Sequence, residues 1–514
     1  MSKEVVPTES KIPFIKRMIR GTASSALNQA ILGVQAFILV PFFLHAWGNS
    51  YYGKWLVLTS VVSYMALLDF GSQNYVANLL AMDRARGDKV NFTKNLSEGV
   101  SLFLFLGVIS FFILVLLLFI ISNTAMLFLS YSLESWKIWV LVFLGCHMFL
   151  LAIPAGIYVT AYWSAGLFVR GVMLGNLMRA LSIVVSIWLL YIRIKPIWYA
   201  AAILGMGVLT TIVVIWDTRR YIPECRHIRI SLENARLGLK HLRNSFYFWL
   251  IAVAQVVNQQ GVVLVLATVS SPIAVALYAT HRTFANISNY GSQLIQGPIF
   301  PELSFLWAQK RFSDLKQITF FAIKILTIIT GSIAIFLWFS APLIYPIWTA
   351  RHLEFQGFLF SILLIQGVLA AGWSTSVWSL VAANHHRVIA RWSLANGLLT
   401  VCLAAWLVRK HGIMGVAIAS LVGDLVCGAA IFPILASSFL KISTKEIYRW
   451  IFLAALALIP VIAIAILTNV FLQGWWFISA LFFICVGFLY PMMWISVGSK
   501  GIRRGLELFK TAWS

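Results

Sequence analysis

Long apolar runs separated by short polar connections dominate the pattern of residues along this chain. A transmembrane helix needs about 20 mainly apolar residues to cross a hydrocarbon core about 30 Å thick. Fourteen predicted spans cover residues 22–45, 55–81, 96–121, 136–160, 171–192, 198–216, 246–269, 272–300, 318–340, 356–383, 391–408, 413–436, 450–472 and 475–497. The sequence therefore predicts an all-α polytopic membrane protein, and the even number of spans predicts both termini on the same side.

The eighth predicted span carries a stripe of polar side chains. Its members follow one another at spacings of four or three residues, so on one helix they share a face. The polar stripe consists of Arg282, Asn286, Asn289, Gln293 and Gln296. Arg282 lies roughly 15 Å from the start of this span, near the middle of the membrane. Because a charge there is costly in lipid, we expect the stripe to line a water-filled cavity or, alternatively, to bind neighbouring helices.

Other polar residues inside predicted spans have the same two interpretations. Asn28 in the first span and Asn258 in the seventh could bind cargo or hold helices together. Arg179 and Lys324 are the remaining basic residues within spans. The acidic residues Asp69 and Asp424 are candidates for proton or sodium coupling, or for structural contacts.

The charges of the chain agree with a membrane protein and predict its orientation. Hydrophobic residues make up 61% of the sequence and charged residues 11%, yet the net charge is +23. In a soluble protein this charge would suggest a nucleic-acid partner. Here 29 of the 39 lysines and arginines fall in one alternating set of connections and tails, against seven in the other. The positive-inside rule therefore predicts cytoplasmic termini and no nucleic-acid partner.

The longest connection, between Asp217 and Asn244, divides the chain into two predicted lobes. The predicted parts are a cytoplasmic segment 1–20, an N-lobe 21–217, a basic linker 218–245, a C-lobe 246–437, and a final helix pair with its tail, 438–514. A weak internal repeat supports two six-helix lobes around a central cavity, since Asn28-Gln29 recurs as Asn258-Gln259. The linker is predicted to form an amphipathic helix on the anionic leaflet or, alternatively, a solvated basic loop.

The sequence lacks the usual motifs of catalysis. It has no phosphate-binding lysine loop, no metal-ligand cluster and no nucleophile elbow, and its five cysteines show no paired spacing. The connections are too short for a soluble catalytic domain. We therefore predict a protein that is not an enzyme and needs no cofactor or metal. A membrane glycosyltransferase or polymerase is a remote alternative, because these proteins usually have a large external loop.

Six short motifs resemble those of the O-antigen flippases in the polysaccharide transporter family. They lie at residues 47–55 (WGNSYYGKW), 67–71 (LLDFG), 278–283 (YATHRT), 301–303 (PEL), 347–349 (IWT) and 382–385 (AANH). Their order and spacing agree with that family. The resemblance implies membership of the multidrug/oligosaccharidyl-lipid/polysaccharide exporter (MOP) superfamily, with two lobes around a cavity that opens alternately to either side.

The resemblance also implies a cargo and a location. Such proteins move an undecaprenyl-pyrophosphate-linked oligosaccharide from the cytoplasmic to the periplasmic leaflet of the bacterial inner membrane. The cavity residues expected to meet this cargo are Arg282, Asn286, Asn289, Gln293, Asn28, Asn258, Arg179 and Lys324. Asp69 is the first candidate for ion coupling and Asp424 the second. Expected partners are the lipid-linked glycan, membrane lipids, a polysaccharide polymerase and a chain-length regulator. A cation-coupled drug or metabolite antiporter and a lipid II flippase are the alternatives.

Overall fold

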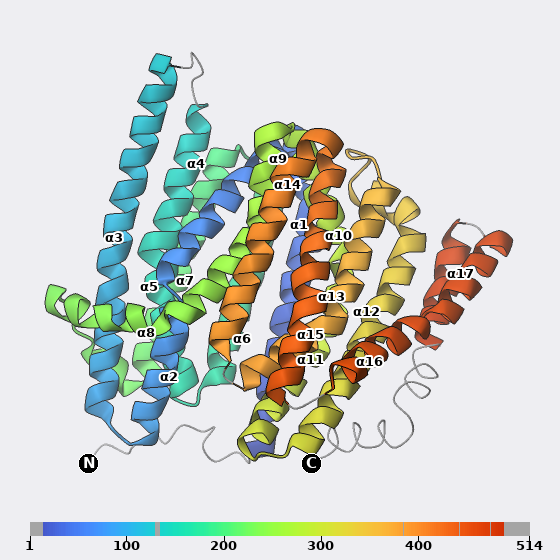
Figure 1. The fold of residues 1–514 in the computed structure, drawn as a ribbon. Coiled ribbons are helices and arrows are strands. Elements are labelled where there is room, and N and C mark those ends of the chain that lie inside the picture. Colours follow the sequence, from blue (N-terminus) through green and yellow to red (C-terminus); the bar gives the residue numbers. More distant parts are fainter. Residues whose placement is uncertain (1–13, 129–133, 384, 441–442, 473, 488–514) are drawn as a thin grey trace. The chain divides into compact units, whose positions relative to one another are not determined.

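The computed structural model describes residues 14–128, 134–383, 385–440, 443–472 and 474–487, and every regular element within these ranges is a helix (Figure 1). The predicted all-α fold is therefore confirmed. In these ranges, ten helical segments are long and apolar enough to cross a membrane. Together they cover twelve of the fourteen predicted spans in whole or in part, because two of the segments each overlap a pair of spans. The protein is a multi-pass membrane protein.

The helices group into two compact units, which are described separately. The first unit comprises described residues 54–256. Its helices are the second part of α1 (Phe14–Met65), α2 (Ser72–Ala85), α3 (Lys89–Phe128), α4 (Ser135–Cys146), α5 (Ile153–Ser164), α6 (Phe168–Tyr191), α7 (Pro196–Tyr221) and α8 (Leu232–Val256). Short helical turns η2 (Ala66–Asp69), η3 (His147–Ala152) and η4 (Pro223–His227) connect them.

The second unit comprises residues 14–53 and the described residues from 257 onward. It contains the first part of α1, η5 (Val257–Gly261), α9 (Val262–Val269), α10 (Pro272–Ala285), α11 (Ile287–Ala308), α12 (Phe312–Trp348), α13 (Gly357–Ala382), α14 (His386–Gly423), η6 (Asp424–Ile431), α15 (Phe432–Leu440), α16 (Thr444–Leu456) and α17 (Ile459–Phe471). The division into an N-lobe, 21–217, and a C-lobe, 246–437, stays a prediction.

Two glycines divide long helices where the sequence pattern predicts span boundaries. Gly48 has φ 69° and ψ 174° inside α1, and Gly412 has φ 53° and ψ −132° inside α14. Residues with a Cβ rarely adopt these angles, whereas glycine does so readily. The chain can therefore turn at these points and begin the next span.

The prediction of uninterrupted helices was wrong in three places. The thirteenth predicted span, 450–472, divides at Ala457 and Leu458 between α16 and α17. The second predicted span breaks after Asp69, where Phe70 and Gly71 have φ values of 51° and 64°. The eighth breaks at Asn286, which separates α10 from α11. The polar stripe therefore runs over two successive helices instead of one.

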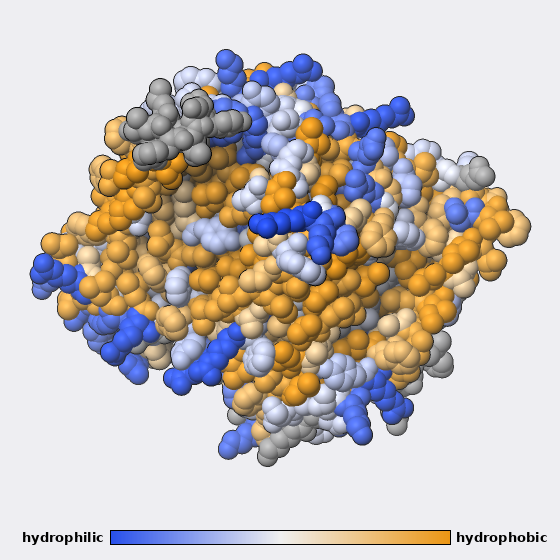
Figure 2. All heavy atoms as spheres, turned by 45° about the horizontal axis from the view of Figure 1, so that its top comes forward, coloured by the Kyte–Doolittle hydropathy of each residue, from blue (hydrophilic) through white to orange (hydrophobic). Residues whose placement is uncertain are grey.

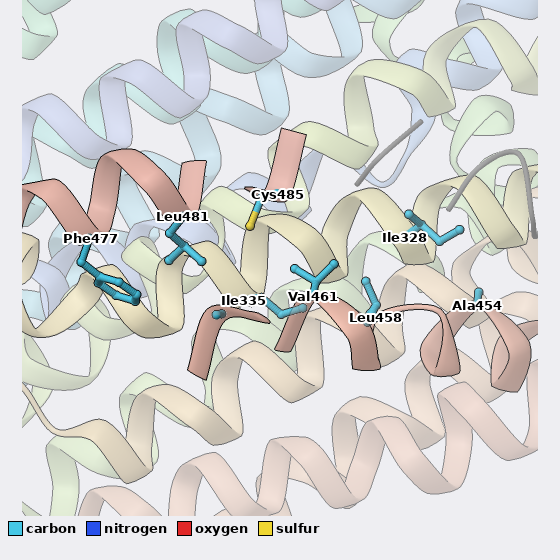
Figure 3. Packing of buried hydrophobic residues seen from close by; sticks show 9 residues of the cluster. Ile328, Ile335, Ala454, Leu458, Val461, Phe477, Leu481 and Cys485 are labelled. Atoms are coloured by element: carbon cyan, nitrogen blue, oxygen red, sulfur yellow. The ribbon is translucent and has the colours of Figure 1, made fainter. Parts of the chain in front are cut away.

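Apolar packing attaches the last helices to α12. Ile328 and Ile335 of α12 are buried in one apolar cluster with Leu458 and Val461, at the start of α17 (Figure 3). The helical segment 474–487 contributes to the same cluster. The side chains of this last segment in the cluster are Phe477, Leu481 and Cys485. The predicted final helix pair thus packs on α12 over its described part, while the end of the fourteenth span lies outside the described residues.

Large apolar side chains also cover much of the molecular surface (Figure 2). On α3, Phe112 and Phe119 are among a series of exposed apolar residues. Exposed apolar faces of this size are costly in water but are expected for helices that contact lipid.

Candidate functional site

Arg282 lies near the end of α10, in the second unit, where it contacts a distorted helical turn. Its Nη1 donates a hydrogen bond of 2.7 Å to the carbonyl oxygen of Gln259. Its guanidinium carbon also lies 5.5 Å from the centre of the Tyr278 ring. The Arg282 side chain is half-buried, so part of its surface is covered by neighbouring residues and part is exposed. The prediction that this charge faces protein or a cavity agrees with these contacts.

The turn that Arg282 contacts is π-helical and includes Asn258. In a π-helix, hydrogen bonds run from i to i+5, which disturbs the regular α-helical pattern around the inserted residue. The Gln259 carbonyl accepts the arginine hydrogen bond from this turn. Such turns are frequent at functional sites. Arg282 therefore binds the same π-helical turn that contains Asn258.

The break between α10 and α11 places two amides of the polar stripe side by side. The Nδ2 atom of Asn289 lies 3.5 Å from Oδ1 of Asn286. Asn289 also lies against Gly367 of α13, where a Cβ atom would come within 3.2 Å of its Nδ2. These contacts show that Asn289 takes part in helix packing. Gln293 and Gln296 follow along α11 and are half-buried.

The first part of α1 belongs to the same unit as the stripe. A Cβ atom on Gly33 would come within 3.1 Å of the Tyr290 ring, so α1 and α11 approach closely. Asn28 lies five residues before this contact and is half-buried. The structure thus brings Asn28, Asn258, Arg282 and the amides of the stripe into one unit.

Two predicted cavity residues lie in other surroundings. The Lys324 ammonium lies 3.3 Å from the ring centre of Trp450, so it contacts α16. Arg179 lies on α6 of the first unit, and its buried Nη1 has no hydrogen-bond partner among the described residues. Their assignment to a cargo cavity stays a prediction.

Asp424 is buried among amides at the start of the π-helical turn η6. It is 8% exposed, and its two oxygens accept hydrogen bonds from Gln366 (2.7 Å) and Asn396 (3.1 Å). No lysine, arginine or histidine of the described ranges forms an ion pair with it. A carboxylate without a basic partner is costly in a membrane-spanning segment, and such residues often mark ion pathways.

Asp69 has a local structural role. Its Oδ1 accepts a hydrogen bond of 2.8 Å from the Gly71 amide, across the break in the second predicted span. The same break receives hydrogen bonds from α8, where Trp249 donates to the Leu67 carbonyl and Ser245 to the Phe70 carbonyl. Asp69 therefore helps to hold a helix break that α8 covers.

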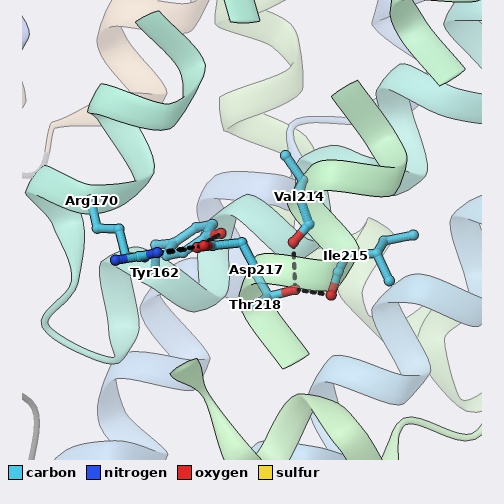
Figure 4. A network of polar contacts seen from close by, with 6 residues as sticks. All are labelled: Tyr162, Arg170, Val214, Ile215, Asp217 and Thr218. Carbon is cyan, nitrogen blue, oxygen red and sulfur yellow. Dashed lines mark hydrogen bonds and ion pairs between the residues drawn. The ribbon is translucent and has the colours of Figure 1, made fainter. Parts of the chain in front are cut away.

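Sequence reasoning missed a buried ionic network in the first unit (Figure 4). Arg170 binds Asp217 through two hydrogen bonds, of 2.9 Å and 2.5 Å, and Tyr162 donates to the same carboxylate at 2.6 Å. Arg170 also stacks on Tyr221 at 3.5 Å. Both charged residues lie at span ends, where Arg170 was counted only among the basic residues of the connections and Asp217 only marked the start of the longest connection. The available signal was an acid and an arginine at the same predicted end of neighbouring spans.

Comparisons with known proteins bear on the fold. No protein-family model and no curated protein sequence matches this chain. The lipid II flippase MurJ, in an inward closed conformation, has a TM-score of 0.68 at 14% identity, over 93% of this chain and 98% of MurJ. An outward-facing multidrug resistance MATE family transporter of the MOP superfamily has a TM-score of 0.60 at 15% identity, over 83% and 96% of the two chains.

The chain has the MOP transporter fold. A third example of this fold, a MOP superfamily transporter from Pyrococcus furiosus described as having a binding pocket of reverse polarity, has a TM-score of 0.55. The two chains are 16% identical, and the match covers 84% of this chain and 96% of the Pyrococcus furiosus transporter. The MOP fold agrees with the architecture implied by the six motifs, whereas the polysaccharide transporter family itself is not identified by these comparisons.

Proposed function

We propose that this protein is a flippase that moves an undecaprenyl-pyrophosphate-linked oligosaccharide from the cytoplasmic to the periplasmic leaflet of the bacterial inner membrane by alternating access. The MOP fold supports a transporter. MurJ, which shares this fold, is named as a flippase of lipid II, which is itself a lipid-linked substrate. The six motifs of the sequence resemble O-antigen flippases. This combination favours an oligosaccharide cargo on a polyprenyl carrier.

The observation that carries the proposal is the position of Arg282 among amides inside a membrane-spanning unit. A pyrophosphate group needs cationic hydrogen-bond donors to leave water, and a guanidinium provides two donors in a geometry that matches phosphate oxygens. Arg282 uses one donor for the Gln259 carbonyl among described contacts and has others to offer. Asn286, Gln293, Asn28 and Asn258 provide amides suited to sugar hydroxyl groups, with Asn289 beside them.

Asp424 is the candidate that we favour for coupling transport to an ion gradient. It is held by two amide donors and has no basic partner in the described ranges, so reversible binding of a proton or a sodium ion would remove an uncompensated charge. Asp69 is the weaker candidate, because its carboxylate already stabilises a helix break. Substituting Asp69 by Asn keeps an acceptor for the Gly71 amide and is therefore the matched control for Asp424→Asn.

A cation-coupled drug or metabolite antiporter is the second candidate. Asp424 and the likeness to MATE transporters favour it. Such a protein would recognise cationic cargo, and the guanidinium of Arg282 would repel that cargo at the polar stripe. We therefore place it behind the flippase. A lipid II flippase differs from our proposal only in the sugar that is carried.

Deletion of the gene in its native bacterium tests the proposal. We expect loss of a surface polysaccharide together with accumulation of lipid-linked repeat units on the cytoplasmic side of the membrane. Delivery of these units to the periplasm at the normal rate, with only their polymerisation lost, would contradict the flippase and favour a polymerase. Cross-linking in the parent strain, which still contains the protein, would test for contact with a polymerase or a chain-length regulator.

A further inference from the structure

A cationic pocket lies in the first unit, whereas the polar stripe belongs to the second unit. It has a volume of about 550 Å³ and lies between the start of α3, the short helix η4 and the start of α8. Basic residues contributed by these segments include Lys89, Lys94 and Arg229. All three side chains are exposed. This cationic pocket can therefore be reached from outside the helical bundle.

The charge of the pocket is suited to a phosphate group. Its one acidic lining residue, Glu224, is 6% exposed and forms an ion pair of 2.7 Å with Arg84. This pairing compensates the carboxylate, so Lys94 and Arg229 leave the lining positively charged. Lysine and arginine are the side chains that bind phosphate oxygens most effectively, through charge-assisted hydrogen bonds.

The backbone that carries Arg229 is fixed on α3. Its amide donates to Ser97 Oγ at 3.2 Å, and its carbonyl accepts hydrogen bonds from Ser101 (3.3 Å) and Asn234 (2.7 Å). The segment between η4 and α8 is therefore held in place before any ligand binds. A fixed backbone lowers the entropic cost of binding.

The pocket lies at the ends of helical segments that are long and apolar enough to cross a membrane. One apolar span begins at Lys89 and another ends at Tyr221, two residues before η4. Trp216 and Tyr221, near the end of α7, are exposed aromatic residues of the kind found at membrane–water interfaces. An exposed apolar side chain accompanies the basic ones, since Val90 lines the pocket and is 79% exposed. This combination of charges and apolar contacts fits a lipid better than a soluble phosphate.

We propose that the cationic pocket binds the phosphate of an anionic phospholipid headgroup. Lys94 and Arg229 bind the phosphate oxygens, while Val90 contacts the first part of the acyl region. The basic linker predicted from the sequence then does more than lie on an anionic leaflet, because it completes a defined lipid site. This inference does not depend on which cargo the protein carries.

Lipid retention by the purified full-length protein tests the proposal. Native mass spectrometry would measure phosphatidylglycerol and phosphatidylcholine bound to the wild type and to the double variant Lys94→Gln/Arg229→Gln. We expect the wild type to bind more phosphatidylglycerol than phosphatidylcholine. The variant should retain at least tenfold less phosphatidylglycerol than the wild type. The matched control is Arg236→Gln/Arg243→Gln, which removes two exposed charges of α8 that do not line the pocket. It should retain phosphatidylglycerol.

A charge-preserving variant and a soluble competitor complete the test. Lys94→Arg/Arg229→Lys should keep the preference for phosphatidylglycerol, which separates the loss of charge from a folding defect. Equal losses in the pocket variant and the α8 control would show attraction to general surface charge and would overturn the proposal. Displacement of phosphatidylglycerol by millimolar inorganic phosphate would overturn it as well, because the site would then bind the free ion.

Discussion

Replacing Arg282 by alanine should abolish most transport while leaving a folded protein. In the structure, the guanidinium makes one charge-assisted hydrogen bond, with the Gln259 carbonyl, and a distant contact with the Tyr278 ring. Loss of the hydrogen bond should lower the free energy of unfolding by about 1.5–3 kcal/mol. Loss of the ring contact should lower it by about 0.5–1 kcal/mol. These are upper values, because the side chain is half-buried and water can replace part of the interaction.

The substitution should also weaken the binding of a pyrophosphate. Two parallel hydrogen bonds from a guanidinium to phosphate oxygens contribute about 3 kcal/mol or more together, which corresponds to a loss of about a hundredfold in affinity. Arg282→Lys keeps the charge but only one point of contact, so we expect an intermediate defect of about tenfold. Asn286→Leu, which removes an amide without changing the charge, should also be intermediate.

The assay is complementation of the deletion strain, with surface glycan and cytoplasmic lipid-linked units measured at matched levels of membrane protein. Thermal unfolding in detergent serves as the measure of folding. Arg351→Ala, at an exposed arginine of the loop after α12, is the matched control and should behave as the wild type. Wild-type glycan in Arg282→Ala would refute the cargo role. Full rescue of both glycan and thermal stability by Arg282→Lys would instead assign Arg282 to helix packing.

Three further predictions concern other parts of the molecule. Asp424→Asn should reduce transport driven by an ion gradient at least tenfold in vesicles, and an unchanged response to the gradient would exclude Asp424 from coupling. A Cβ on Gly53 would come within 1.8 Å of the Pro272 carbonyl, so Gly53→Ala should cost about 1–3 kcal/mol of stability, whereas Gly205→Ala, with open space around it, should not lower the melting temperature. Burial lowers the pKa of His241 below its usual value, so the unfolded chain binds more protons below about pH 6.5 and the protein should lose stability on acidification. His241→Gln should weaken that loss in melting curves between pH 7.5 and 5.5, and an identical pH profile would contradict it.

The sequence predicted the spans because lipid imposes a simple rule on them. Long apolar runs must be helical to satisfy their backbone groups, and glycines such as Gly48 and Gly412 stand where one span gives way to the next. The break at Gly71 was not predictable from the local pattern. It is stabilised by contacts with Trp249, whose backbone nitrogen would lie 2.5 Å from a Cβ on Gly71. Such a contact depends on the packing of residues far apart in sequence.

The candidate site was predictable in its residue types more than in its geometry. The spacing of the polar stripe identified Arg282 and its amides, but no periodicity shows that the helix breaks at Asn286 or that a π-helical turn accepts the arginine. The ion pair of Arg170 with Asp217 joins residues 47 positions apart. Charges at span ends satisfy the positive-inside rule whether or not they pair, so the pattern could not distinguish the two cases.

Transport by the purified protein in liposomes tests the central claim most directly. Undecaprenyl-pyrophosphate-linked oligosaccharide would be placed in the liposomes, and an enzyme or lectin added outside would measure its arrival in the outer leaflet. We predict rapid arrival with the wild type and a rate close to that of protein-free liposomes with Arg282→Ala. Equal rates for the wild type and protein-free liposomes, with a folded protein present, would contradict the flippase account.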